Sequence, residues 1–192
     1  MWGKEMCFKR FFSFLIIFLL GSTVAHSSQK QKIIEKLDNI QNVSFNFSQV
    51  VKDKIEDGNC KIHYPKKIFC KYSGKSGKIL VSNGKTLVIK VKRSGAYYIY
   101  PIEKTPLNLI LDKNYLIEKI NEIKISDEEK ENITLEIKEN NQNLKIFFDK
   151  KNFIINGWKT TDIYNNENLM IISAIKINES LNDKIFILPK SD

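Results

Sequence analysis

The chain has few of the side chains from which catalytic and metal sites are most often built. Among its 192 residues there are only two histidines, His26 and His63, and three cysteines. A metal site with several histidine ligands is therefore excluded. The sequence also contains no G-x-S-x-G elbow, no phosphate-binding P-loop and no H-E-x-x-H zinc motif. Asp149 and Asp162 are isolated carboxylates that fit strand ends or turns, so we expect neither an enzyme nor a bound cofactor.

Arginine is nearly absent, since Arg10 and Arg93 are the only two in the chain. The positive balance, 31 Lys and Arg residues against 22 Asp and Glu residues, consists almost entirely of lysine. Proteins that recognise nucleic acids rely on arginine forks and on aromatic platforms for stacking, and the sequence shows neither. We therefore expect no nucleic-acid partner and interpret the lysines as a solvated face. Attraction to an anionic membrane surface is the alternative.

Only one long apolar run is present, at residues 11–20. Basic residues precede this run, Gly21 ends it, and Thr23 and Ala25 stand where a signal peptidase requires small residues. This layout is typical of a secretory signal peptide. The alternative is an uncleaved anchor, but a membrane-spanning helix needs about 20 apolar residues. We expect residues 1–25 to be removed on export.

Two cysteines follow the signal segment, which itself contains Cys7. Cys60 and Cys70 belong to two short predicted strands that turn near Pro65, so that Cys60 falls opposite Cys70. Cross-strand Cβ atoms lie about 4.5–5.5 Å apart, which is close to the separation that a disulfide requires. An oxidising compartment favours such a bridge, and the alternative is two free, buried cysteines.

Residues 26–192 have the length of one domain, and we expect them to form a soluble, monomeric domain in the periplasm. Helical spacing of apolar residues predicts a helix at 29–41 and one or two short helices at 104–125. Period-two alternation and turn signals predict strands in hairpin order at 42–51, 60–64, 68–72, 78–82, 86–92, 96–100, 132–138, 143–149, 152–163, 168–177 and 183–189. The turn signals include Asp57-Gly58 and Asn83-Gly84, the second of which is a strong hairpin signal. The pattern predicts a mainly β (α+β) fold, a curved antiparallel sheet of about 10–11 strands with helices over its open side.

Apolar residues inside the predicted strands mark one inner face of this sheet. We expect this face to carry Phe47, Ile62, Ile68, Leu80, Leu87, Ile89, Ile99, Ile137, Phe147, Ile155 and Trp158. An ordinary hydrophobic core is one interpretation. The predicted helices are too short to fill a face of this size, so the second interpretation is an apolar cavity suited to acyl chains.

Four segments in order make the chain similar to the LolA family of periplasmic lipoprotein carriers. They are FNFSQ at 45–49, HYPKKIFCKY at 63–72, ILVSNGKTLVI at 79–89 and KTPLNLIL at 104–111. The resemblance implies a half-open antiparallel β-barrel with a lid of short helices over a hydrophobic cavity. It also implies acylated lipoproteins as cargo, an inner-membrane ABC transporter that releases them and an outer-membrane receptor that accepts them. The alternative is a non-enzymatic sensor or adaptor of the same fold that binds a membrane regulator or another lipid.

The resemblance assigns roles to individual positions. Ile68 and Leu80 match cavity positions, and Leu107 matches a lid position. The helical spacing adds Ile33, Leu37, Ile110 and Leu111 to the expected lid. The chain departs from the family at two places.

The first departure is Tyr64, which stands before the hairpin proline where the family commonly has an arginine that holds the lid shut. A tyrosine hydroxyl donates one hydrogen bond but lacks the planar fork of arginine. The second departure is Cys70, which replaces a tryptophan and would be joined to Cys60. How the lid is latched is therefore an open question at this stage.

Overall fold

The computed structural model describes residues 28–123, 131–139, 142–161 and 166–191. The predicted signal peptide and Asp162 lie outside the described residues. Within these ranges, no helix combines the length and the apolar composition that crossing a membrane requires.

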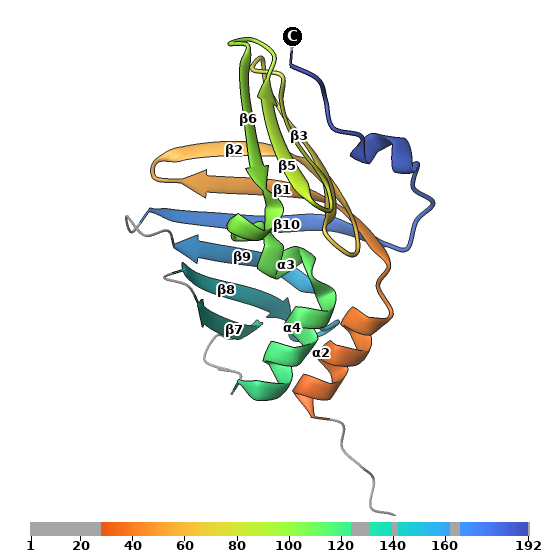
Figure 1. Cartoon of the computed structure of the whole chain (residues 1–192). Coiled ribbons are helices and arrows are strands. Elements are labelled where there is room, and N and C mark those ends of the chain that lie inside the picture. Colours follow the sequence, from red (N-terminus) through yellow and green to blue (C-terminus); the bar gives the residue numbers. More distant parts are fainter. Residues whose placement is uncertain (1–27, 124–130, 140–141, 162–165, 192) are drawn as a thin grey trace, which may run out of the picture.

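In the described part of the chain, ten antiparallel strands form one sheet (Figure 1). Their order is β6-β5-β4-β3-β2-β1-β10-β9-β8-β7, so consecutive strands pair everywhere except between β6 and β7, and β10 returns to lie beside β1. The strands are β1 Asn42–Val51, β2 Lys54–His63, β3 Lys67–Tyr72, β4 Lys78–Asn83, β5 Thr86–Val91, β6 Ala96–Pro101, β7 Asn132–Glu139, β8 Gln142–Asp149, β9 Ile155–Thr161 and β10 Glu167–Ile177. The sheet stays open between β6 and β7, which confirms the predicted mainly β, half-open fold.

Short helices lie over one face of the sheet, which we call the inner face. They are α2 Gln29–Asp38, the 3-10 helix η2 Ile102–Lys104, α3 Leu107–Leu111 and α4 Lys113–Glu122. Side-chain caps begin the two longer helices, because Ser28 accepts from the Gln31 N–H and Asp112 accepts from the Tyr115 N–H. Figure 1 shows α2 and α4 side by side near β8 and β9, with α3 between them and the upright strands β3 to β6.

Helices and sheet share one hydrophobic core. Ile33 and Leu37 of α2 and Leu116 and Ile120 of α4 are buried in the same cluster as Phe148 of β8. The buried members of β7 and β8 alternate along each strand, as expected when only one face of an antiparallel sheet is covered. This half of the inner face is therefore covered by helix, whereas, among the described elements, only η2 and α3 lie over the inner face of the half formed by β2 to β6.

The opposite face, the outer face, carries the C-terminal segment. The 3-10 helix η3, Asp183–Phe186, packs on β3 and β4, and Phe186 is buried there. The Tyr97 hydroxyl and the Lys90 ammonium donate to the backbone carbonyls of Pro189 and Lys190. The prediction of an edge strand at 183–189 is wrong, since the side chain of Asn182 accepts from the Lys184 N–H and starts a tight helical turn.

Candidate binding cavity

A cavity of about 420 Å³ lies between the inner face of the sheet and the segment that leads into α3. Apolar side chains form most of its wall, and polar side chains from several strands and from the segment before α3 complete it. The lining residues are Gln49, Cys60, Ile68, Cys70, Tyr72, Lys78, Leu80, Leu87, Ile89, Tyr100, Lys104, Thr105, Pro106, Leu107, Trp158, Thr160, Asn168 and Met170. The lining residues, which are spread along the chain from Gln49 to Met170, thus meet around one cavity.

Strand register explains why these side chains meet. Across β2, β3, β4 and β5, the residues Cys60, Cys70, Leu80 and Ile89 stand directly opposite one another in one row. Because side chains in a strand alternate between faces, the whole row points to the inner face. The next row on this face is made by Ile62, Ile68, Ser82, Leu87 and Tyr100.

A disulfide joins Cys60 and Cys70 in the middle of this wall. Both residues are almost fully buried, and they are directly opposed in the β2–β3 ladder. The bridge therefore fixes the hairpin that carries Ile68 and presents a small, apolar surface to the cavity.

Of the residues that the sequence assigns to the cavity, five line it: Ile68, Leu80, Leu87, Ile89 and Trp158. Phe47, Ile62, Ile137 and Ile155 are buried in the adjoining core. The Phe47 ring packs edge-on against Tyr72 with 4.9 Å between ring centroids. Ile62, Ile155 and Trp158 line a small internal gap of about 30 Å³ beneath the helices.

Two assignments to the inner face are wrong. Ile99 pairs with Val88, lies on the outer face and is 60% exposed, while its neighbour Tyr100 lines the cavity. Phe147 is half-buried opposite Gly157, and the inner-face residue of this stretch is the fully buried Phe148. In both strands apolar residues occupy consecutive positions, so alternation alone does not reveal which one points inward.

The predicted lid residues lie where the helices meet the sheet. Ile33, Leu37, Ile110 and Leu111 are buried, and the half-buried Leu107 lines the cavity next to Pro106. The helical cover is tied together at its ends, because the Lys113 ammonium donates to the backbone carbonyls of Asp38 (2.8 Å) and Ile40 (3.3 Å). From here on, α2, α3 and α4 together are called the lid.

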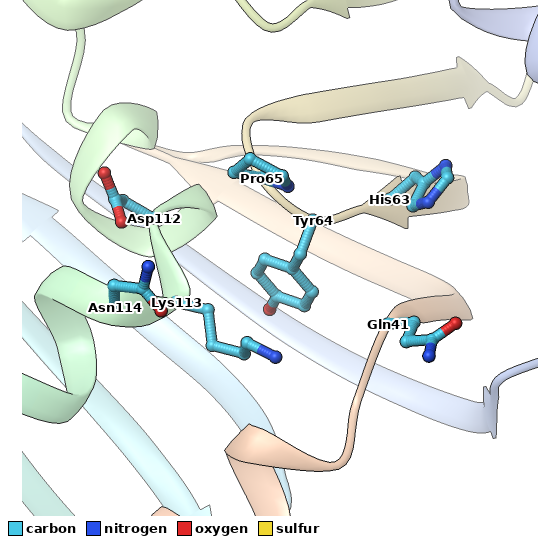
Figure 2. A pocket seen from close by; sticks show the side chains of 7 residues that line it. All are labelled: Gln41, His63, Tyr64, Pro65, Asp112, Lys113 and Asn114. Atoms are coloured by element: carbon cyan, nitrogen blue, oxygen red, sulfur yellow. The ribbon is translucent and has the colours of Figure 1, made fainter.

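The hairpin between β2 and β3 contacts the lid beside a second, shallower pocket of about 300 Å³ (Figure 2). Tyr64 contributes its ring, which Figure 2 shows directed toward Lys113, and burial raises the pKa of Tyr64 to about 12. Among the residues that the structure describes, the Tyr64 hydroxyl has no hydrogen-bond partner. The polar link to the lid comes instead from Lys66, whose N–H donates to the Leu111 carbonyl at 3.0 Å and whose ammonium lies 3.1 Å from the Asp112 carboxylate.

Sequence reasoning missed the polar end of the cavity. There the Tyr72 hydroxyl donates to Gln49 Oε1 (2.8 Å), and Gln49 Nε2 donates to Asn168 Oδ1 (2.9 Å). The Lys78 ammonium lies 3.8 Å from the centre of the Tyr72 ring and 2.6 Å from a Glu56 oxygen. Tyr72 and Gln49 lie on strands that were correctly predicted, but nothing local in the sequence connects residues 49, 72 and 168.

The charges at this end are balanced within the protein. Burial, aided by the negative charge of Glu56, raises the pKa of Tyr72, so its hydroxyl stays a hydrogen-bond donor at neutral pH. Partial burial alone would raise the pKa of Glu56, but hydrogen bonds and charge from Lys78 and Lys54 outweigh it and hold that pKa below its usual value. An apolar chamber with one hydrogen-bonding end is suited to hold an amphiphilic molecule.

Comparison with known proteins agrees with this architecture. The sequence model of the family described as "Outer membrane lipoprotein carrier protein LolA" matches residues 38–188. The chain therefore belongs to the LolA family. No curated protein sequence matches it.

Some solved structures resemble the chain in fold at very low sequence identity. An uncharacterized conserved protein from Thermus thermophilus is 8% identical, with a TM-score of 0.53 over 85% of this chain and 96% of that one. A LolA superfamily protein from Nitrosomonas europaea is 11% identical, with a TM-score of 0.45 over 83% and 97% of the two chains. A putative outer membrane lipoprotein-sorting protein domain from Vibrio parahaemolyticus is 8% identical, with a TM-score of 0.48 over 81% and 95%.

Proposed function

We propose that this protein is a non-enzymatic periplasmic carrier that shields acyl chains of lipoproteins from water and passes them from the inner to the outer membrane. The observation that carries the proposal is the apolar cavity formed by the Cys60–Cys70 hairpin, Leu80, Leu87 and Ile89 on one side and Leu107 on the other. Membership of the LolA family supports the same interpretation. An inner-membrane ABC transporter would load the carrier, and an outer-membrane receptor would unload it.

The size of the cavity sets how much cargo fits without rearrangement. A methylene group occupies about the volume of a water molecule, roughly 30 Å³, so about 420 Å³ takes roughly fourteen methylenes, or one long acyl chain. A cargo with several chains needs more room. The lid is the part that can supply it, because α3 is five residues long and borders the cavity.

The energetics set the condition under which cargo is transferred. Each buried methylene contributes about 0.8 kcal/mol, so one enclosed chain is held strongly against return to water. A receptor that buries a few more methylenes than the carrier takes the cargo over without an energy source. The lid of the emptied carrier then closes again.

A matched pair of variants tests the proposal. Leu80→Glu places a charge in the cavity wall, whereas Ile99→Glu places the same charge on the outer face of the same sheet. The mature protein is incubated with membranes that contain an acylated lipoprotein, and soluble carrier–lipoprotein complex is measured by size exclusion. We expect the wild type and Ile99→Glu to form the complex and Leu80→Glu to lose it while remaining folded by circular dichroism.

The proposal fails if the wild type never retains acylated cargo, or if both variants retain it equally. A stable complex with a membrane regulator in the absence of any acyl cargo would instead support the sensor or adaptor interpretation. Mass spectrometry of the exported protein gives the mature N-terminus, the state of Cys60 and Cys70 and any bound lipid in one measurement.

A further inference from the structure

We infer that the polar end of the cavity is a subsite for the carbonyl oxygen of an acyl group in ester or amide linkage. This inference rests on the proposed function and adds to it a direction of binding. The carbonyl lies between Asn168 and Thr160, and the hydrocarbon chain extends from there toward Leu80 and Leu107.

The first observation is a pair of donors that point to the cavity with nothing to donate to. Asn168 and Thr160 stand directly opposite each other in the β9–β10 ladder, and both line the cavity. Within the described ranges, neither the Thr160 hydroxyl nor the Asn168 side-chain N–H groups have an acceptor in the protein. A partly buried donor without a partner is unfavourable unless water or a ligand supplies an acceptor.

The second observation is the order of the hydrogen-bond chain that reaches this point. The Tyr72 hydroxyl donates to Gln49, and Gln49 donates to Asn168 Oδ1 at 2.9 Å. This series of hydrogen bonds therefore occupies the side-chain oxygen of Asn168 and fixes the orientation of its amide. The N–H groups of the amide are left to donate to a ligand in the cavity. The remaining groups, the Asn168 N–H groups and the Thr160 hydroxyl, are donors, so the ligand must supply an acceptor atom.

The charges favour a neutral acceptor over an anion. Two lysines line the cavity, Lys78 and Lys104. Lys78 is the one joined to Tyr72, and its ammonium is already engaged by Glu56 at 2.6 Å and by the face of the Tyr72 ring. A carboxylate head would need a free cation close to it, whereas an ester or amide carbonyl needs only neutral donors.

The apolar wall begins immediately beside the two donors. Trp158 lies two residues before Thr160 on the same face of β9, and Met170 lies two residues after Asn168 on β10. A ligand whose carbonyl binds the donors therefore has its first methylenes against Trp158 and Met170. An acyl group has this polarity, one acceptor oxygen at the head of a long apolar chain.

Two uncharged ligands that differ in one oxygen test the subsite. They are the palmitate ester of a short polyethylene glycol and the hexadecyl ether of the same glycol, each measured by displacement of a polarity-sensitive fluorophore from the mature protein. Because the two donors are neutral groups, which contribute modestly to binding, we expect the ester to bind about three- to tenfold more tightly than the ether.

The variants separate the donors from the general shape of the cavity. Thr160→Val removes the hydroxyl at constant shape, and Asn168→Asp keeps the oxygen that accepts from Gln49 but removes the N–H donors. Each should lower the ester-to-ether ratio, because one of the two donors is lost, and the double variant should bring it close to one. Thr161→Val makes the same change at the next residue, which points to the other face, and should leave the ratio unchanged. Leu80→Ala should weaken both ligands by the same factor.

The outcomes separate the two proposals. If both ligands bind the wild type equally, or if the ester preference is undiminished in Thr160→Val and Asn168→Asp, the subsite does not exist although the carrier function stands. If neither ligand binds, the proposed function itself fails. Thermal unfolding of each variant identifies any loss of binding that reflects loss of the fold.

Discussion

The Lys66 ammonium lies 3.1 Å from the Asp112 carboxylate, and this contact joins the β2–β3 hairpin to the junction of α3 and α4. The backbone reinforces it, since the Lys66 N–H donates to the Leu111 carbonyl at 3.0 Å. Asp112 serves two purposes, because its other oxygen caps α4 by accepting from the Tyr115 N–H. We call this pair the Lys66–Asp112 latch. Lys66 lies two residues after Tyr64, the position at which the LolA family commonly has the arginine that holds the lid shut.

The latch predicts how easily the lid opens. Lys66→Ala should remove about 0.5–1 kcal/mol from the closed state, the usual size of a partly exposed ion pair. Asp112→Asn should have the same effect because asparagine still caps α4, whereas Asp112→Ala should cost about 1 kcal/mol more. Hydrogen exchange of the amides in residues 107–122 measures the opening.

An adjacent lysine is the control for the latch. Lys67 pairs with Asp183 at 3.5 Å, on the outer face, so Lys67→Ala should leave exchange in the lid unchanged. Equal protection of residues 107–122 in Lys66→Ala and the wild type would show that the pair does not hold the lid.

Loss of the disulfide should loosen one wall of the cavity. Cys60 and Cys70 close a loop with a sequence separation of 10, for which chain entropy in the unfolded state predicts a stabilisation of about 2–3 kcal/mol. Replacing both residues with alanine should lower the free energy of unfolding in urea by that amount. Adding a reductant should lower the stability of the wild type similarly and leave the double variant unaffected, which separates the bond from the packing of the side chains.

Glu56 should make stability depend on acidic pH. Its pKa is below the usual 4.5 in the folded protein, so the unfolded chain takes up the proton first as the pH falls. The stabilisation is therefore complete above about pH 4.5 and is lost as the pH drops through the lower, folded value. The Glu56→Gln variant should be less stable than the wild type at neutral pH. Its free energy of unfolding should also fall less than that of the wild type when the pH is lowered.

Urea unfolding at several pH values checks this expectation. The matched control is Glu118→Gln, since Glu118 is exposed on α4 and has no ion pair among the described residues. Parallel stability curves for Glu56→Gln and the wild type below pH 4.5 would contradict the assignment.

The sequence was sufficient for most strands and turns but not for all of them, nor for every side-chain orientation. Asn83-Gly84 was predicted as a hairpin turn, and the Asn83 side chain does accept from the Thr86 N–H there. Asp57-Gly58 gave the same kind of signal, yet Gly58 lies inside β2. A Cβ at Gly58 would approach the Phe47 ring to 2.6 Å, so glycine is present for packing across strands and not for a turn.

Long-range polar contacts were beyond the reach of the sequence. The Lys66–Asp112 latch and the Gln49–Asn168 bond each join residues that are distant along the chain, and no local pattern marks them. Hydrophobic alternation predicts which residues share a face. It does not predict which lysine on a lysine-rich surface meets which carboxylate.

The C-terminal segment should stabilise the β3–β5 part of the sheet from outside. Phe186 is 3% exposed and lies beneath the Lys67 ammonium, while the next residue, Ile187, is 68% exposed. Phe186→Ala removes a buried ring and should cost about 3 kcal/mol or more, whereas Ile187→Ala should change stability by less than about 0.5 kcal/mol. Because β3 to β5 also form the cavity wall, hydrogen exchange in these strands should rise in Phe186→Ala while the lid amides keep their protection. A variant that unfolds the whole chain in one step without this local loosening would instead show that the segment and the cavity wall form one cooperative unit.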